Sequence, residues 1–347
     1  MNFDPSSPDY PLYDTQLAIA RRQEKRQMFI DCSKLGALLI LYNILTRVTN
    51  YLYYIVAASV HSGSFIPLPS DAINYLREHQ EVVQSTTFSM AGNLFIVAVS
   101  VTVVLVAARF LLKVRLSGMA RPRLRHFSQG MMWMPLCIVI NTVIAIIVTI
   151  LQNYLSAFGV TIPESDFSIT TPTTLAIVFQ FVYVIIVGPF VEEVVYRGLI
   201  LTLLKPYGKW LAIFVSALIF GMMHGNIPQM ASAFASAIIM GIIAVQCDSI
   251  IPTLIIHIMN NITASITDFT DALGWSGGYD LYICIKILIF FAGLFVAFTC
   301  WRKLRIKEGT YAMTGGQRAA AVFTNIPMLV YLGYLLYQLV KGIVEAN

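Results

Sequence analysis

Titratable side chains lie inside the long apolar segments of this 347-residue chain, where charged groups are scarce. Glu192 and Glu193 are adjacent in one such segment, and His224 and His257 lie in two later ones. Asn261 follows His257 by four residues, which places both on one face of a helix. An ionisable group at membrane depth costs at least about 2.5–3.5 kcal/mol, so each is a functional candidate by default. Together these side chains have the chemistry to activate water and to stabilise an oxyanion.

The spacing around the glutamates adds detail to this candidate site. Glu193 and Arg197 are four residues apart and are expected to form an ion pair along one helix face. Glu192 is rotated by about 100° from Glu193 around the helix, so we expect it to point elsewhere. Gly188 and Pro189 precede the glutamates and predict a break or kink that makes room for water.

The segment that contains His257 also carries two asparagines, Asn260 and Asn261. At helical spacing His257 and Asn261 face one cavity, and Asn260 is expected to point away from that face. Counted at 1.5 Å per residue, the candidate residues reach a similar depth near the middle of a membrane. We expect the cavity that these residues line to open toward the cytoplasm, because the motifs lie nearer the inner half of the membrane.

The composition indicates the class of protein to which these residues belong. Hydrophobic residues make up 57% of the chain and charged residues 12%, whereas soluble globular domains average about 25% charged residues. Such a small charged fraction cannot cover a soluble surface, which excludes a soluble enzyme, a disordered protein and a nucleic-acid-binding protein. The sequence therefore predicts a membrane protein whose partner is the lipid bilayer, with no nucleic-acid partner.

Apolar stretches near the length that crosses about 30 Å of hydrocarbon are the candidate spans. They cover residues 35–60, 88–112, 131–156, 173–203, 209–226, 229–247, 250–267, 280–301 and 321–343. With the N-terminus inside, eighteen of the 23 Lys and Arg residues fall in inside loops and two in outside segments, as the positive-inside rule requires. The predicted fold is an all-α integral membrane protein with eight or nine transmembrane helices and a cytoplasmic N-terminus. The alternative for 321–343 is a helix at the interface.

Three basic residues, Arg47, Arg197 and Lys286, fall within the predicted spans. Arg47 lies midway along the first span. Two interpretations of Arg47 are open: it snorkels to the interface, or it is a distant counter-charge for the site.

Three motifs, in order and in separate spans, resemble those of one family. Residues 192–198, Glu-Glu-Val-Val-Tyr-Arg-Gly, match EExxxR. Residues 220–224, Phe-Gly-Met-Met-His, match FxxxH, and residues 257–261, His-Ile-Met-Asn-Asn, match HxxxN. These are motifs of the CAAX protease and bacteriocin-processing (CPBP) family, also called the Abi or type II CAAX prenyl endopeptidase family. The resemblance covers about 172–268, and Tyr196 departs from it, because the family often has Phe there.

The resemblance implies an all-helical intramembrane protease. Its expected substrates are membrane-associated peptides or lipidated, CAAX-like proteins, as in bacteriocin maturation or immunity. Glu192 then looks like the general base that activates water, and His224 like a residue that helps to hold this water. His257 and Asn261 look like the oxyanion stabilisers.

The resemblance also divides the chain into segments. Residues 172–268 are the predicted catalytic core of four transmembrane helices, in which Glu193 and Arg197 look like supporting residues. We expect a multi-pass protein of a bacterial cell membrane. The other segments are a cytoplasmic amphipathic N-terminal segment (1–34), three N-terminal transmembrane helices (35–171) and the C-terminal transmembrane helices (269–347).

A zinc-dependent form of the same protease is one alternative. Glu192, His224 and His257 contain the two histidines and one carboxylate of many catalytic zinc sites, and the family is often labelled as metalloproteases. The sequence contains no HExxH helix, and the three ligands would have to converge from three spans. Asn261 beside His257 also suits an oxyanion site better than a zinc site. We therefore favour a protease without a cofactor and keep zinc as the alternative.

Two non-proteolytic functions form a second alternative. A proton-coupled transporter would use Glu192 and the histidines as a relay, and an immunity or scaffold protein would retain the motifs without activity. Transporters of this kind often contain inverted repeats, and the sequence shows no such repeat.

Overall fold

The computed structural model describes residues 10–113, 123–164 and 168–347, and every regular element in these ranges is a helix. The all-α class expected from the sequence is confirmed. Residues 1–9, at the start of the predicted N-terminal segment, lie outside the described ranges. So do Arg115 and Arg121, two of the bases counted in the inside loop between the predicted spans 88–112 and 131–156.

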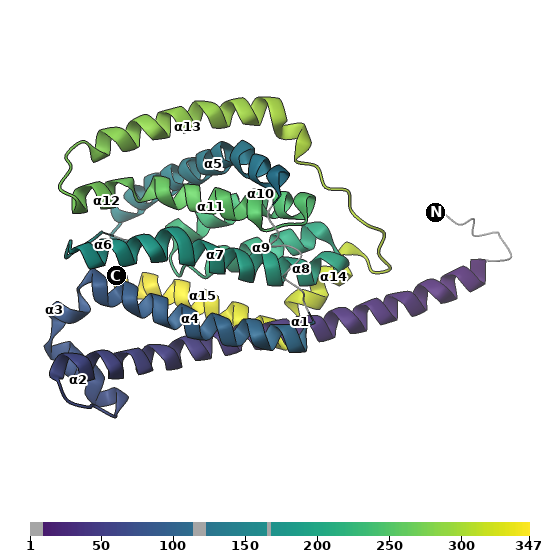
Figure 1. Ribbon diagram of the computed structural model, residues 1–347. Helices are drawn as coiled ribbons and strands as arrows, with labels where there is room; N and C mark the ends of the chain where they lie inside the picture. The colour runs from purple at the N-terminus through teal and green to yellow at the C-terminus, as the bar shows by residue number, and fades with distance from the viewer. Residues whose placement is uncertain (1–9, 114–122, 165–167) are drawn as a thin grey trace.

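The helices form a bundle of long, roughly aligned rods (Figure 1). The N-terminal half of the chain forms α1 (Tyr10–Ser62), α2 (Pro69–Glu78), α3 (Gln80–Val83), α4 (Thr86–Leu111) and α5 (Leu124–Ser156). A continuous helical stretch follows, built of α6 (Thr174–Gln180), η2 (Phe181–Val187), α7 (Gly188–Glu192), η3 (Glu193–Leu201), α8 (Thr202–Leu204) and η4 (Lys205–Tyr207). The remaining helices are α9 (Lys209–Met222), α10 (Ile227–Cys247), α11 (Ile251–Ala264), α12 (Ile266–Ala272), α13 (Gly278–Cys300), η5 (Trp301–Lys303), α14 (Gly315–Phe323) and α15 (Ile326–Ala346).

Seven helices in the described ranges are long and apolar enough to cross a membrane, and each overlaps one of the predicted spans. The other two predicted spans, 209–226 and 250–267, correspond to α9 and α11, which have 14 residues each. At 1.5 Å per residue each is about 21 Å long, shorter than a hydrocarbon layer of about 30 Å. The chain is thus a multi-pass, all-α membrane protein, and the number of eight or nine spans stays a prediction.

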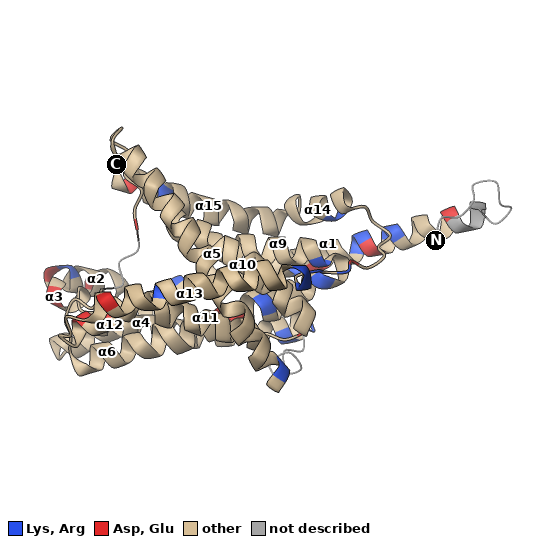
Figure 2. Ribbon diagram, turned by 90° about the horizontal axis from the view of Figure 1, so that it is seen from above, with Lys and Arg blue, Asp and Glu red and all other residues tan. Residues whose placement is uncertain are grey.

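Basic residues gather at one end of the bundle, which we call the base-rich end (Figure 2). There Lys205 pairs with Asp248 at 2.5 Å, and the Lys209 ammonium donates to the Lys307 carbonyl at 2.7 Å. These contacts join loops that the sequence assigns to the inside. The opposite, base-poor end carries α2, α3 and α12 (Figures 1 and 2). The clustering agrees with the predicted orientation.

Helix α9 starts at the base-rich end and is capped by a distant loop. The Glu308 carboxylate accepts hydrogen bonds from the backbone N–H groups of Lys209 at 3.1 Å and Trp210 at 2.9 Å. Partial burial acts to raise the pKa of Glu308, but the hydrogen bond from Tyr311 and those from the two N–H groups outweigh it, so this pKa is lowered. An ionised carboxylate at a helix N-terminus is stabilised by the unpaired N–H groups and the helix dipole.

Helix α1 runs without interruption from Tyr10 to Ser62, so the predicted amphipathic segment and the first predicted span are parts of one helix. Its early turns project beyond the bundle at the base-rich end (Figure 1). Further along, the Arg47 guanidinium donates to the Tyr334 hydroxyl of α15 at 3.2 Å and lies 5.5 Å from the ring centroid. Arg47 is therefore held by an aromatic partner and forms no ion pair within the described part of the chain.

The orientation predicts that two engineered cysteines lie on opposite sides of the membrane. Glu78→Cys at the end of α2 should react with a membrane-impermeant maleimide in intact cells, because it lies at the base-poor end. Gly316→Cys in α14 should react only after permeabilisation. The readout is maleimide labelling in a chain whose native cysteines are replaced by serine, with that background chain as the control. The reverse pattern would contradict the cytoplasmic N-terminus.

Candidate active site

The helix that carries the two glutamates does not break at Gly188 and Pro189. It continues through both residues, with π-helical turns on either side, η2 before them and η3 after them. Proline removes one backbone donor, and the wider π-helical turns accommodate the disturbed hydrogen-bond ladder without the chain leaving the helix. Such π-helical turns are frequent at functional sites. The expected break is therefore replaced by a local widening next to Glu192 and Glu193.

Glu193 and Arg197 form the ion pair that their spacing predicts. The Arg197 guanidinium donates to the Glu193 carboxylate at 2.9 Å, and both side chains are almost completely buried. The guanidinium carbon of Arg197 also lies 4.5 Å from the centroid of the Phe220 ring. A buried charge needs such partners, because its desolvation would otherwise cost several kcal/mol.

His257 lies between the two glutamates. Its Nδ1 is 3.0 Å from Glu193 Oε1, and its Nε2 is 3.5 Å from Glu192 Oε2. Both carboxylates thus reach the same imidazole, from opposite nitrogens, although Glu193 points into the core and Glu192 into a cavity, as their different directions on the helix predict. Glu193 is fully buried, whereas the Glu192 side chain is 23% exposed. Glu192 is thus the carboxylate that water can reach, and Glu193 orients the ring.

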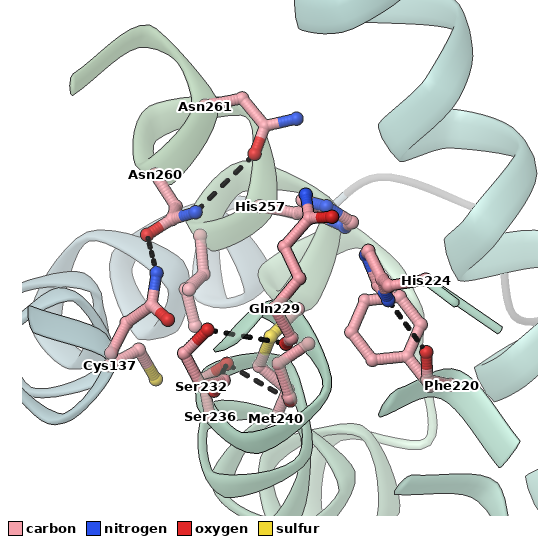
Figure 3. Close-up of a pocket in the computed structure, with 13 residues that line it drawn as sticks. Cys137, Phe220, His224, Gln229, Ser232, Ser236, Met240, His257, Asn260 and Asn261 are labelled. Atoms are coloured by element: carbon pink, nitrogen blue, oxygen red, sulfur yellow. Dashed lines mark hydrogen bonds between the residues drawn. The ribbon is translucent and has the colours of Figure 1, made fainter. Parts of the chain in front are cut away.

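Glu192 opens into a cavity with about 460 Å³ of space for water, which is also lined by His224, His257 and Asn261. The structure thus brings the four predicted catalytic residues to one cavity. A smaller chamber of about 110 Å³ adjoins it and shares His224, His257 and Asn261 (Figure 3). The lining of the larger cavity continues to Asp268, near the base-poor end. The entrance on the cytoplasmic side stays a prediction.

His224 lies on a turn and not, as the predicted span 209–226 implies, within a helix. Helix α9 ends at Met222, Gly225 adopts a positive φ of 72°, and the Asn226 side chain caps α10. His224 Nδ1 is 2.9 Å from the Phe220 carbonyl oxygen. A carbonyl only accepts, so Nδ1 carries the proton and Nε2 is the nitrogen left to bind water. Among the described residues, no hydrogen bond joins His224 directly to Glu192.

Asn260 lines the cavity together with Asn261, so the expectation that it points away is wrong. Its side-chain N–H donates to Asn261 Oδ1 at 3.3 Å, and its carbonyl oxygen accepts from Asn141 at 3.0 Å. Asn261 in turn donates to the Val184 carbonyl in η2 at 2.8 Å. Sequence reasoning missed Asn141 of α5. The signal was present, because Asn141 is an isolated amide in the apolar stretch 131–156.

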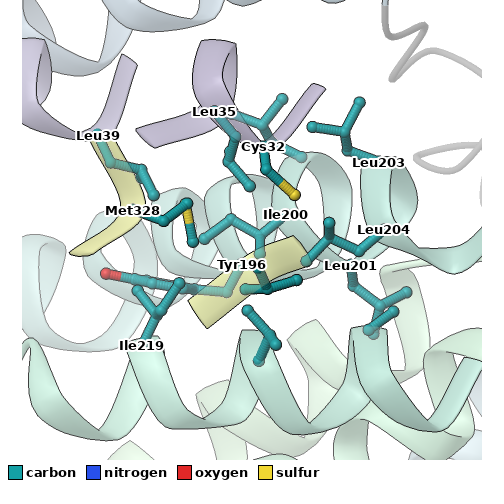
Figure 4. Packing of buried hydrophobic residues seen from close by; sticks show 14 of the residues in the cluster. Cys32, Leu35, Leu39, Tyr196, Ile200, Leu201, Leu203, Leu204, Ile219 and Met328 are labelled. Atoms are coloured by element: carbon teal, nitrogen blue, oxygen red, sulfur yellow. The ribbon is translucent and has the colours of Figure 1, made fainter. Parts of the chain in front are cut away.

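The helix with the glutamates is fixed by the largest apolar core of the bundle. Every residue of η3 is buried, and its Tyr196 and Ile200 pack among residues of α1, α9 and α15 (Figure 4). The Ser216 hydroxyl of α9 donates to the Tyr196 carbonyl at 2.7 Å, which satisfies a backbone acceptor of the π-helical turn. The glutamates therefore sit on a rigid, tightly packed element.

The candidate zinc ligands Glu192, His224 and His257 do not form a three-ligand site in this conformation. Both ring nitrogens of His257 face carboxylates, and Nδ1 of His224 faces a carbonyl. Over the ranges that the structure describes, no three His, Cys, Asp or Glu side chains are grouped so that they could hold a metal ion. A catalytic zinc site needs three protein ligands around one point.

The burial of Glu193 predicts a large loss of stability in Arg197→Met. Removal of one partner leaves a buried, uncompensated charge, which costs about 3–5 kcal/mol. The detergent-solubilised variant should therefore unfold at a clearly lower temperature, as followed by intrinsic fluorescence. The double variant Glu193→Leu/Arg197→Met is the control and should regain much of the stability, because both charges are gone. An unchanged unfolding temperature in the single variant would contradict a stabilising role for the pair.

Comparison with known proteins identifies the core that contains these residues. Residues 174–263 match the family described as type II CAAX prenyl endopeptidase Rce1-like. The matched range starts with α6 and contains all three motifs. No curated protein and no solved structure matches the chain. Residues 174–263 are thus similar to the type II CAAX prenyl endopeptidase Rce1-like family, in agreement with the resemblance that the three motifs indicate.

Proposed function

We propose that this protein hydrolyses peptide bonds in membrane-associated or lipidated, CAAX-like substrates with water activated by Glu192. The observation that carries the proposal is the contrast between the two glutamates. Glu193 is sealed in the core by Arg197 and His257, whereas Glu192 borders a cavity large enough for water and a peptide segment. A carboxylate that reaches water but is shielded from bulk solvent suits general-base catalysis.

In the proposed reaction, water sits between Glu192 and the Nε2 atom of His224. Glu192 takes one proton from this water, and the oxygen attacks the carbonyl carbon of the scissile peptide bond. The carbonyl electron pair moves to its oxygen and forms a tetrahedral intermediate. Glu192 then gives the proton to the leaving amine as the C–N bond breaks, which regenerates the carboxylate.

The proposed oxyanion donors are the His257 imidazole and the Asn261 amide, which line the same cavity. Glu193 accepts from Nδ1–H of His257 and holds the ring, so that Nε2 faces the cavity beside Glu192. In the proposed intermediate the ring is the imidazolium, which carries a proton on both nitrogens, so Nε2–H donates to the oxyanion while Nδ1–H donates to Glu193. Asn261 is held by the Val184 carbonyl and by Asn260. Donors fixed in advance stabilise a developing negative charge without reorganisation at the moment of reaction.

Glu192→Gln should lower peptide hydrolysis by about 10²–10⁴-fold, the range for loss of a general base. The amide keeps the shape of the carboxylate but cannot accept the proton from water. Cleavage of candidate peptides by purified protein in liposomes, followed by mass spectrometry, provides the readout. Glu81→Gln on α3, an exposed acid outside the cavity, is the matched control and should retain activity. Identical products from the wild type and Glu192→Gln would refute proteolysis by this site and favour a transporter, immunity or scaffold function.

We also propose that no metal takes part, because both ring nitrogens of the candidate ligand His257 already face carboxylates. Exhaustive treatment with a membrane-permeant zinc chelator should then leave the rate of peptide cleavage unchanged. Elemental analysis of the untreated protein provides an independent readout. Stoichiometric zinc that disappears in both His224→Ala and His257→Ala would overturn the metal-free proposal and support the zinc-dependent protease.

A further inference from the structure

Lys286 of α13 is a cation at membrane depth with no carboxylate partner among the residues that the structure describes. It lies eight residues after the start of α13, about 12 Å along the helix. The other two bases within the predicted spans have partners: Arg197 pairs with Glu193, and Arg47 binds Tyr334. Within the described ranges no ion pair contains Lys286. Because a charge at this depth is costly, its retention calls for a ligand or a function.

The Lys286 ammonium points into the bundle and not along the surface of α13. It donates to the Thr142 hydroxyl of α5 at 3.1 Å and lies 5.3 Å from the centroid of the Tyr282 ring. The two helices pack closely further along, where a Cβ atom at Gly293 would lie 2.8 Å from the Pro135 carbonyl oxygen. A lysine that only snorkels would follow the helix toward the interface. Lys286 is instead held across a helix–helix interface.

The ammonium lines a cavity of about 410 Å³, which we call the lysine pocket. This pocket shares Asn141 and Ala264 with the active-site cavity. Asn141 is the residue that donates to Asn260, which in turn donates to Asn261. An anion bound to Lys286 is therefore next to the site at which a peptide bond would be cleaved.

We propose that Lys286 binds the free C-terminal carboxylate of the peptide substrate, and this inference rests on the proposed function. A CAAX sequence ends three residues after its cysteine, and three extended residues span about 10 Å. The carboxylate of such a substrate therefore lies close to the scissile bond, in the neighbouring pocket. The apolar side chains of Ala145, Ile146 and Ile150 line the same pocket and suit an apolar C-terminal residue.

The test compares two peptides of one sequence, one with a free C-terminal carboxylate and one with a C-terminal amide. The wild type should cleave the free acid with a kcat/KM at least about tenfold higher, which corresponds to about 1.4 kcal/mol. Lys286→Gln should remove this preference by lowering kcat/KM for the acid alone, and Lys286→Arg should restore most of it. Equal cleavage of acid and amide by the wild type, or an equal loss for both peptides in Lys286→Gln, would overturn the inference.

A binding experiment separates this inference from the proposed function. Glu192→Gln removes the proposed base, so binding of both labelled peptides to this variant, followed by fluorescence anisotropy, does not depend on cleavage. The double variant Glu192→Gln/Lys286→Gln should bind the peptide acid about tenfold more weakly than Glu192→Gln does. Binding of the peptide amide should be the same in both variants. If the wild type cleaves neither peptide but this difference persists, the proposed function fails and the carboxylate site stands.

The head group of an anionic lipid is a second possible ligand of Lys286. The test therefore also varies the lipid composition. The binding measurements are repeated in vesicles of phosphatidylcholine with and without phosphatidylglycerol. A peptide carboxylate predicts the same Lys286-dependent preference for the acid in both vesicles. If Lys286 affects only the response to phosphatidylglycerol, the ligand is a lipid head group and the inference is overturned.

Discussion

The buried carboxylate of Glu193 is the constraint on which the site depends. A carboxylate at this depth is stable only with positive or donating partners, and Arg197 and His257 are among those of Glu193. Arg197 comes from the same helix, whereas His257 comes from α11, so one charge fixes the distance between two helices. The orientation of the His257 ring, and through it the position of its Nε2 beside Glu192, follows from the need to satisfy Glu193.

Adjacent glutamates reach one imidazole because the helix between Phe181 and Leu201 is not a regular α-helix. The π-helical turns η2 and η3 widen it on either side of α7. Two carbonyls of these turns accept side-chain hydrogen bonds: Val184 accepts from Asn261, and Tyr196 accepts from Ser216. Polar side chains from α11 and α9 thus bind backbone carbonyls of the two π-helical turns. The π-helical turns and the side chains of the candidate site are therefore held together by the same contacts.

The candidate residues could be predicted because polar groups are rare in apolar spans, and Glu192 and His257 are conspicuous there. The ion pair of Glu193 followed from helical spacing alone. The turn at His224 could not be predicted from hydropathy, because an apolar composition does not mark where a helix ends. The direction of Asn260 was mistaken because the spacing along one helix says nothing about a polar partner on the next helix, here an asparagine of α5.

The length of α9 sets the distance of His224 from the base-rich end of the bundle. Its N-terminus is anchored at the base-rich end by Glu308, and its 14 residues carry the chain about 21 Å before the turn at His224. The depth of His224 is therefore counted from one membrane surface and does not depend on the thickness of the bilayer. In a thicker membrane the far boundary moves away while the site keeps its distance from the near one. Bilayer thickness then changes the distance from His224 to the base-poor side, and its distance from the base-rich side stays fixed.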